Sequence, residues 1–341
     1  MKVLVTGAAG FIGYHLCKKC MENNFPLIGI DNLNSYYDKN LKLNRLEDLK
    51  NFSASKKKDF NFKKIDLQDK YLLEEIFKKH KITHVVNLAA QAGVRYSLEN
   101  PHSYVESNIS GFLNILELSR TFNIEHLIYA SSSSVYGGNT KMPFSEDHGV
   151  DHPVSMYAVT KRSNELMAHS YSHLYKLPAT GLRFFTVYGP WGRPDMALYL
   201  FTKAIFEDKP IKVFNYGKMK RDFTFIDDII EGIIKLINNP PVENIALNTK
   251  EYSPASSWAP FRLLNIGNSN PANLEEYISA IEKFTNKKAE RILMAMQPGD
   301  VENTYAETKK LEECINYKPK TTIEEGIAKF IEWYKSYYGI N

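Results

Sequence analysis

The chain has 341 residues, which is long enough for one large domain or two modest ones with a substantial core. Its 43 basic and 39 acidic residues give a formal net charge of +4, too small to indicate binding to nucleic acid or to a membrane surface. Three cysteines argue against a disulfide scaffold, and no apolar run is continuous enough for a transmembrane or secretory segment, so we expect a cytoplasmic protein.

A glycine-rich turn follows the first predicted strand. Residues 2–5 are rich in β-formers, residues 6–13 read Thr-Gly-Ala-Ala-Gly-Phe-Ile-Gly, and a helical pattern continues through Cys20. Strand, glycine turn and helix in this order are typical of a dinucleotide site, because Gly7, Gly10 and Gly13 let the backbone approach a pyrophosphate at the positive end of the helix. The spacing is G-x-x-G-x-x-G rather than G-x-G-x-x-G.

A carboxylate ends the second predicted strand, where apolar residues 27–30 lead into Asp31. A carboxylate at this point can accept both hydroxyls of an adenosine ribose and repels a 2′-phosphate, so the sequence predicts NAD rather than NADP. The alternative, an ordinary turn residue, is less favoured once the glycine turn is in place.

The alternation of strands and helices then continues. Residues 62–66 predict a third strand with Asp66 placed to reach an adenine, and residues 84–90 a fourth that ends in small side chains. A long helix over residues 107–122 and a fifth strand over 126–130 follow. This order indicates an α/β fold with a doubly wound parallel sheet of the Rossmann type.

Four serines, residues 131–134, follow the fifth strand. Ligands of such sheets bind outside the carboxyl ends of the strands, so the serine hydroxyls are expected where a substrate lies. An ordinary polar loop is the alternative.

Tyr157 and Lys161 lie four residues apart in a predicted helix and therefore on one face. A tyrosine with a pKa of ~10 is a poor base, but a nearby ammonium favours the phenolate and lowers that pKa. The pair could move a proton to or from a hydroxyl. Taken alone, such a pair is more often a solvated one.

Two other patterns suggest metal or redox chemistry only weakly. Cys17 and Cys20 form C-x-x-C inside a helix rather than at its N-terminus, where a thiolate is stabilised. His169 and His173 are four apart, but they lack a third ligand and an H-E-x-x-H pattern. We expect no metal site.

Together, in their order and spacing, these motifs resemble the extended short-chain dehydrogenase/reductase family of nucleotide-sugar enzymes, the NAD-dependent epimerases and dehydratases. The resemblance covers essentially the whole chain. The matching stretches are residues 6–13, Asp31, residues 87–90, residues 131–137, Tyr157 with Lys161, and residues 221–228.

Within that family the chain is most similar to the UDP-glucuronate 4-epimerases, through residues 31–38 with 41–42, residues 184–197 and residues 256–262. UDP-galactose epimerases usually have asparagine in place of Thr186. The 4,6-dehydratases carry an Asp-Glu pair where Ser133 and Ser134 stand here, so dehydration would lack its acid and base.

The resemblance implies roles for individual residues. The catalytic residues would be Tyr157, Lys161 and Ser132. NAD would contact Gly7, Gly10, Phe11, Ile12, Gly13, Asp31, Asn32, Asp66, Leu67, Leu88, Ala89, Ala90, Tyr157, Lys161 and Phe184. A UDP-sugar would contact Arg95, Ser132, Ser133, Ser134, Tyr157, Thr186, Arg193, Val213, Arg221 and Asp300.

Three of these residues carry the expectation about the substrate. Arg221 resembles the family arginine that grips the diphosphate, and Thr186 and Arg193, with the serines, would surround the C6 carboxylate of a uronic acid. A neutral hexose would leave Arg193 unpaired in a closed site, at a cost of a few kcal/mol.

The domain prediction divides the chain unevenly. Residues 1–185 plus 225–247 would form the NAD-binding Rossmann domain, and residues 186–224 plus 248–341 a smaller, mixed α/β substrate domain. The family implies a homodimer through helices near residues 107–122 and 154–175. Apolar positions there could equally face the sheet: Leu113, Leu116, Leu166 and Met167.

The expected activity is NAD-dependent C4 epimerisation of UDP-glucuronic acid to UDP-galacturonic acid through a 4-keto intermediate, an isomerase reaction suited to polysaccharide biosynthesis. The alternatives are a UDP-glucuronate decarboxylase, a 4-epimerase of an N-acetylated or neutral UDP-sugar, and a non-enzymatic NAD-binding sensor or scaffold.

Overall fold

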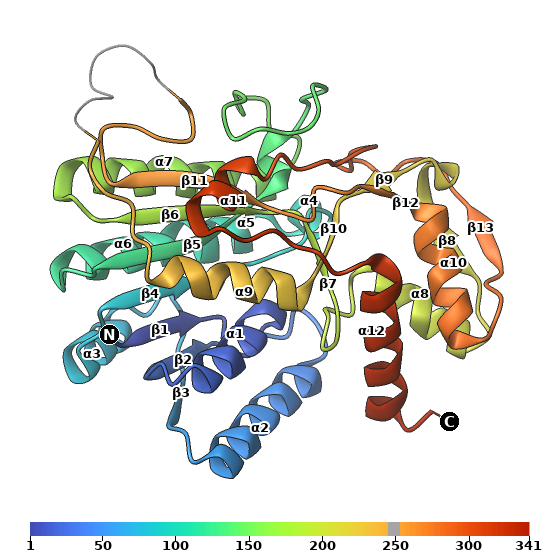
Figure 1. Ribbon diagram of the computed structural model, residues 1–341, viewed down its shortest axis with the longest axis horizontal. Helices are drawn as coiled ribbons and strands as arrows, with labels where there is room; N and C mark the ends of the chain where they lie inside the picture. The colour runs from blue at the N-terminus through green and yellow to red at the C-terminus, as the bar shows by residue number, and fades with distance from the viewer. Residues whose placement is uncertain (245–252, 341) are drawn as a thin grey trace.

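The computed structural model describes residues 1–244 and 253–340, and a seven-stranded parallel sheet forms its centre (Figure 1). The strand order is β11-β6-β5-β4-β1-β2-β3, so the chain winds outward in both directions from β1 and β4. The strands are β1 Val3–Thr6, β2 Leu27–Asp31, β3 Phe60–Lys64, β4 His84–Asn87, β5 His126–Ser132, β6 Ala179–Phe184 and β11 Phe261–Ile266. The predicted doubly wound α/β fold is confirmed.

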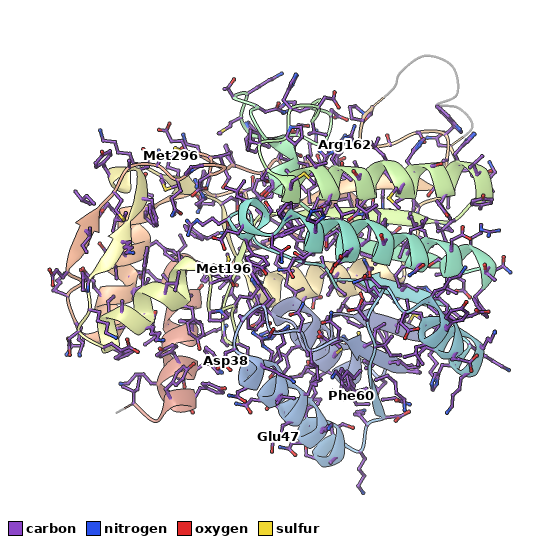
Figure 2. All side chains as sticks on the ribbon, turned by 180° about the vertical axis from the view of Figure 1, so that it is seen from behind. Asp38, Glu47, Phe60, Arg162, Met196 and Met296 are labelled. Carbon is purple, nitrogen blue, oxygen red and sulfur yellow. The ribbon has the colours of Figure 1, made fainter. Side chains whose placement is uncertain are left out.

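Helices cover both faces of this sheet. Its central strands are therefore buried on both sides, as the fully buried β1 shows. One face packs against α1 Phe11–Glu22, α2 Lys39–Lys56 and α9 Ile226–Ile237. The opposite face, seen in Figure 2, packs against α3 Lys70–His80, α6 Gly111–Thr121 and α7 Met156–Tyr175. The carboxyl ends of the strands are therefore the edge left open to ligands.

The boundaries of several elements differ from those predicted. The third strand ends at Lys64, so Asp66 lies beyond it. The predicted long helix begins with a π-helical turn, Val105–Ser110, preceded by α4 Tyr96–Glu99 and α5 Pro101–Tyr104. The fifth strand continues to Ser132 because Ser131 and Ser132 pair in register with β6, and a 3-10 turn, Ser133–Tyr136, follows.

A smaller part of the molecule lies beside the carboxyl edge of the sheet, at the right of Figure 1. Its helices are α8 Ala197–Phe206, α10 Leu274–Thr285 and α12 Ile323–Tyr338, the last begun by a Thr322–Glu325 capping box. Short strands pair as β7 Thr186–Tyr188 with β10 Phe223–Phe225, β8 Ile211–Val213 with β13 Arg291–Leu293, and β9 Lys220–Arg221 with β12 Ala272–Asn273.

One part of the predicted domain division is wrong. Residues 261–266, assigned to the substrate domain, form β11, the edge strand beside β6, and α11 Lys309–Ile315 packs against that strand. The predicted boundary at residues 247–248 lies outside the described residues. For the other segments the division stays a prediction.

The apolar positions expected at a dimer interface are divided between two environments. Leu116 is fully buried and Met167 packs against the core, so these two face the sheet. Leu113 and Leu166 are 41% and 56% exposed. Homodimerisation stays a prediction that only the exposed pair supports.

The cysteine pair lies in the core, where Cys17 and Cys20 are buried free thiols. Burial raises the pKa of Cys20 to about 12, so the reactive thiolate is disfavoured. In residues 1–244 and 253–340, no helix combines the length and apolar character that crossing a membrane requires.

A buried ion pair joins the helix of Tyr157 to the sheet. Glu165 of α7 accepts two hydrogen bonds from Arg183 of β6, at 2.8 and 2.9 Å, and the two side chains are 1% and 0% exposed. Burial raises the pKa of Glu165, but the charge and hydrogen bonds of Arg183, together with the Ser131 hydroxyl and the charge of Arg162, outweigh it and hold the pKa below its ordinary value. Ser131 donates a further hydrogen bond of 2.6 Å to Glu165.

Replacing Glu165 by glutamine should therefore destabilise the protein by about 3–5 kcal/mol, because it leaves the Arg183 guanidinium buried without its counter-charge. Urea unfolding followed by circular dichroism measures this free energy. The matched control is Glu324→Gln, which breaks an exposed pair with Lys283 and should leave the midpoint nearly unchanged. Equal midpoint shifts in the two variants would contradict this account of the buried pair.

Candidate active site

A single cleft of about 1070 Å³ runs along the carboxyl edge of the sheet and continues against the smaller part of the molecule. It brings together the sequence-predicted site residues with one exception. Val213 is fully buried in β8, while its neighbours Lys212 and Phe214 line the cleft. The predicted residues that line it are Gly7, Gly10, Phe11, Ile12, Gly13, Asp31, Asn32, Asp66, Leu67, Leu88, Ala89, Ala90, Arg95, Ser132, Ser133, Ser134, Tyr157, Lys161, Phe184, Thr186, Arg193, Arg221 and Asp300.

The glycine turn forms one end of the cleft and leads into α1. Gly7 has φ +70°, a conformation that favours glycine, and its carbonyl accepts a hydrogen bond of 2.9 Å from the Gly10 N–H. A Cβ added to Gly13 would lie 2.0 Å from the Gly7 oxygen. The turn therefore closes in this way only with glycine at positions 7 and 13, and it presents the N-terminus of α1 to the cleft, as a pyrophosphate requires.

Asp31, at the end of β2, and Asp66, just beyond β3, line the cleft together with this turn. Asp31 accepts hydrogen bonds from the N–H groups of Ala9 at 3.1 Å and Leu33 at 2.8 Å. Burial raises the pKa of Asp31, and these N–H groups oppose the rise. Asn32 donates a 2.8 Å hydrogen bond to Asp66. The three polar side chains suit the hydroxyls and base of an adenosine, so the cleft fits a dinucleotide.

Tyr157 and Lys161 project from α7 into the middle of the cleft. Ser155 caps the start of the helix by accepting a hydrogen bond from the Ala158 N–H, and this cap places the pair in the first two turns. Lys161 Nζ donates a 2.7 Å hydrogen bond to the Ala130 carbonyl and lies 5.9 Å from the centre of the Tyr157 ring.

The predicted lowering of the Tyr157 pKa is wrong for the protein alone. Burial raises the pKa of this phenol, although a hydrogen bond with Ser132 and the positive charge of Arg193 act against the rise. Burial also lowers the pKa of Lys161 to about 8. The sequence pattern identified the pair but could not include the free energy of desolvation.

The four serines do not share one role. Ser131 donates its hydroxyl hydrogen bond to the buried Glu165. Ser132 donates a 3.1 Å hydrogen bond to the hydroxyl of Ser134 and also accepts one from the Ser134 N–H. Ser132, at the end of β5, shares a hydrogen bond with Tyr157, and Ser133 and Ser134 of the 3-10 turn line the same cleft. Glu165 was not predicted, although its place one turn beyond Lys161 on the same helix face was a signal.

Arg193 lines the same cleft as the serines, and the structure corrects the expectation about its charge. Its Nε and Nη2 atoms donate to the two carboxylate oxygens of Asp195, at 3.0 and 2.8 Å. The Tyr36 hydroxyl donates to the same carboxylate at 3.2 Å. Arg193 is already paired, so a neutral sugar would not leave it without a counter-charge.

Two more cations lie at the far end of the cleft. Arg221 donates to Asp300 at 2.9 Å and to the Glu302 carbonyl at 2.7 Å. Arg95 is 3.8 Å from the other oxygen of Asp300 and lies over the Phe214 ring, 5.1 Å from its centre. Two guanidinium groups around one carboxylate leave an excess of positive charge, which suits a diphosphate.

The two helical histidines that suggested a metal have other partners, since His169 bonds to Ser257 and His173 accepts from Trp258. Within the described ranges, no group of three or more His, Cys, Asp or Glu side chains could hold a metal ion.

Comparisons with known proteins agree with this geometry. The chain is 54% identical to protein CapI of Staphylococcus aureus, over 99% of both chains. It is 44% identical to a probable UDP-glucuronate 4-epimerase of Rhizobium meliloti, over 99% of this chain and 98% of the relative. A crystal structure of UDP-glucuronic acid 4-epimerase from Bacillus cereus, in complex with UDP-glucuronic acid and NAD, superposes with a TM-score of 0.86. That match has 34% identity and covers 99% of this chain and 100% of the other.

The family model described as GDP-mannose 4,6 dehydratase matches residues 4–330. This match spans the glycine turn, the Tyr157–Lys161 pair and most of the smaller part of the molecule. The chain therefore belongs to the GDP-mannose 4,6-dehydratase family of NAD-dependent nucleotide-sugar epimerases and dehydratases.

Proposed function

We propose that the protein is an NAD-dependent isomerase that converts UDP-glucuronic acid to UDP-galacturonic acid through a 4-keto sugar. The observation that carries the proposal is one cleft in which the glycine turn, the Tyr157–Lys161 pair and Arg193 face each other. End-to-end similarity to proteins named UDP-glucuronate 4-epimerase supports the same reaction.

The dinucleotide would lie with its pyrophosphate on the glycine turn and its adenosine beside Asp31 and Asp66. When bound, NAD supplies an acceptor that takes hydrogen from the sugar C4 carbon and later returns it. Because the overall redox change is zero, the protein has no reason to release the cofactor between turnovers.

Tyr157 would take the proton from the C4 hydroxyl and later return it. Its phenol must become a phenolate, and Lys161, still largely protonated at pH 7 with a pKa of about 8, provides positive charge below the ring. Ser132 shares a hydrogen bond with the phenol and can hold the same oxygen. Proton transfer by a positioned side chain of this kind typically contributes about 10²–10⁴-fold to a rate.

The 4-keto uronic acid must also be protected. It is a β-keto acid, which loses carbon dioxide when the bond to its carboxylate aligns with the ketone π system. Thr186, Arg193 and the hydroxyls of Ser133 and Ser134 would hold the carboxylate away from that alignment. Ser133 and Ser134 also stand where the dehydratases of the family carry an acid and a base.

A neutral UDP-hexose is the second candidate substrate, and one observation favours it. Arg193 is compensated by Asp195, so the cleft does not demand an anion. Purified protein given either UDP-glucuronic acid or UDP-glucose, without added NAD, and followed by proton NMR of the anomeric region, decides the question. Accumulation of UDP-galacturonic acid supports the proposal. UDP-xylose or a 4-keto pentose would make the protein a decarboxylase, and turnover of UDP-glucose alone would select the second candidate.

We further propose a cytoplasmic homodimer that supplies a galacturonate donor for polysaccharide biosynthesis. The exposed Leu113 and Leu166 on neighbouring helices support the dimer, and a sugar nucleotide as substrate supports the pathway.

The glycine turn gives a prediction about cofactor retention. Gly13→Ala should reduce bound NAD by about tenfold or more, because the new Cβ would meet the Gly7 oxygen and shift the backbone that faces the pyrophosphate. Nicotinamide content after desalting measures this. Gly138→Ala is the matched control, since a Cβ there meets no atom within 4 Å. Wild-type NAD content in the Gly13 variant would refute the assignment of the turn.

Tyr157→Phe should lower turnover of UDP-glucuronic acid by about 10²-fold or more, because it removes the group that exchanges the C4 proton, while NAD stays bound. The NMR assay and the nicotinamide content measure the two properties separately. Tyr71→Phe changes a tyrosine that is 82% exposed and should have no effect. Retained activity in Tyr157→Phe would contradict the assignment of Tyr157 as the group that exchanges the C4 proton.

Thr186→Ala should raise the ratio of decarboxylated pentose to epimer by about tenfold or more, since a hydrogen bond to a charged group contributes about 1.5–3 kcal/mol. The products are separated as sugar nucleotides by ion-exchange chromatography. Thr285→Ala, in α10, is the control, because that hydroxyl bonds only to carbonyls of its own helix among the described residues. A variant that forms no pentose would show that Thr186 does not restrain the carboxylate.

A further inference from the structure

The pairing of Arg193 with Asp195 leaves a defined part of the guanidinium for a ligand. Arginine carries five N–H donors in a planar fork. Asp195 takes the edge formed by Nε and Nη2, and the sulfur of Met196 lies 3.6 Å from Nη2. In the part of the chain that the structure describes, no residue accepts a hydrogen bond from Nη1. Both side chains line the cleft, at 23% and 32% exposure.

Asp195 is itself held in place by a residue of the loop that follows β2. The Tyr36 hydroxyl donates to Asp195 Oδ2, and Tyr36 belongs to the loop between β2 and α2. A Cβ on Gly93 would lie 2.3 Å from the Tyr36 oxygen, so the backbone there fits closely around the hydroxyl. Tyr36 also packs against Tyr96, with ring centres 5.0 Å apart. The carboxylate therefore has a fixed position between a cation and a phenol donor.

The charges of the pair reinforce this geometry. Burial would lower the pKa of Arg193, but the Asp195 carboxylate outweighs it and the guanidinium pKa lies above its ordinary value. Burial would likewise raise the pKa of Asp195, yet Arg193 holds it below the usual range. Both groups are thus charged at neutral pH, and together they present little net charge to a sugar.

We propose that Asp195 is a positioning residue that sets how strongly the cleft prefers a carboxylate over a neutral group at C6 of the sugar. It occupies the Nε–Nη2 edge of Arg193, and the Met196 sulfur lies beside the remaining hydrogen of Nη2, so a substrate carboxylate can meet only the Nη1 end. Asp195 also places a second negative charge beside the substrate's own. This inference rests on the proposed binding of the sugar next to Arg193.

The physical consequence is a weak, one-point grip on the carboxylate. A bidentate arginine–carboxylate pair has fixed geometry and is among the stronger charge-assisted contacts in proteins. A 4-keto sugar that must present both faces has to leave and remake its contacts within one turnover. An arginine that binds the substrate equally tightly before and during the reaction does not raise kcat. An arginine already paired with Asp195 holds the substrate carboxylate less tightly. This weaker contact suits a sugar that has to turn.

The test is Asp195→Asn, which keeps the shape of the side chain, removes its charge and turns an amide group toward one guanidinium nitrogen. In NAD-loaded protein, the dissociation constants of UDP-glucuronic acid and UDP-glucose are measured by calorimetry. The ratio that expresses preference for the uronic acid should rise about tenfold, because a freed guanidinium then meets the substrate carboxylate directly. KM for UDP-glucuronic acid should fall and kcat should not rise.

Tyr36→Phe provides a second variant that leaves both charges in place. Losing the hydroxyl loosens Asp195, and the preference ratio should shift in the same direction by a smaller factor. A merely structural role would instead weaken both sugar nucleotides equally and reduce NAD content, which the same samples report.

The decisive control is the double variant with Arg193→Met. If Asp195 acts through Arg193, then Asp195→Asn changes the preference ratio only where Arg193 is present. An unchanged or lowered ratio in Asp195→Asn, or an equal rise in the Arg193→Met background, overturns the inference. Failure of the wild-type protein to epimerise UDP-glucuronic acid would refute the proposed function separately, because the binding ratios need no turnover.

Discussion

The position of the Tyr157–Lys161 pair depends on the buried contact between Glu165 and Arg183. Three elements that carry the cleft meet there, because Glu165 comes from the helix of Tyr157, Arg183 from β6, and the Ser131 hydroxyl from β5. A charge pair in this place does little for net stability compared with an apolar core, but it has one acceptable geometry. The serine turn and the helix of Tyr157 are therefore fixed relative to the same carboxylate, and neither can shift without breaking its hydrogen bonds.

The parts of the molecule that sequence patterns predicted are those set by local chemistry. The glycine turn, Asp31 and the Tyr157–Lys161 pair each depend on a strand or helix whose period is visible in a few residues. Strand β11 was misassigned because its place depends on pairing with β6, far away in the chain. The pairing of Arg193 with Tyr36 through Asp195 was missed for the same reason, since Tyr36 and Asp195 are 159 residues apart. The raised pKa of Tyr157 was missed because burial is a property of the folded chain.

Positive charge in the cleft is distributed unevenly. Arg193 has its own carboxylate, Asp195, whereas Arg95 and Arg221 share Asp300. The unshared positive charge therefore lies at the end that suits a diphosphate, which carries the fixed charge of every sugar nucleotide. The Arg193–Asp195 pair is close to neutral, so where this pair would meet a sugar, hydrogen-bond geometry rather than net charge has to distinguish one sugar from another.

The loop between β2 and α2 reaches both ends of this arrangement. Asp31 and Asn32 begin it beside the adenosine position, side chains of the loop accept hydrogen bonds from the backbone N–H groups of Leu33, Asn34 and Tyr36 in turn, and Tyr36 ends on Asp195. Only a few residues thus separate the Asp31 carboxylate, proposed to bind the ribose, from the Tyr36 hydroxyl that contacts Asp195. A ligand that orders the loop at one end removes the entropic cost of ordering it for a ligand at the other end. This coupling acts equally in both directions. Cofactor and sugar nucleotide would then each slow the dissociation of the other. This coupling would help the protein to retain NAD while substrate binds and product dissociates.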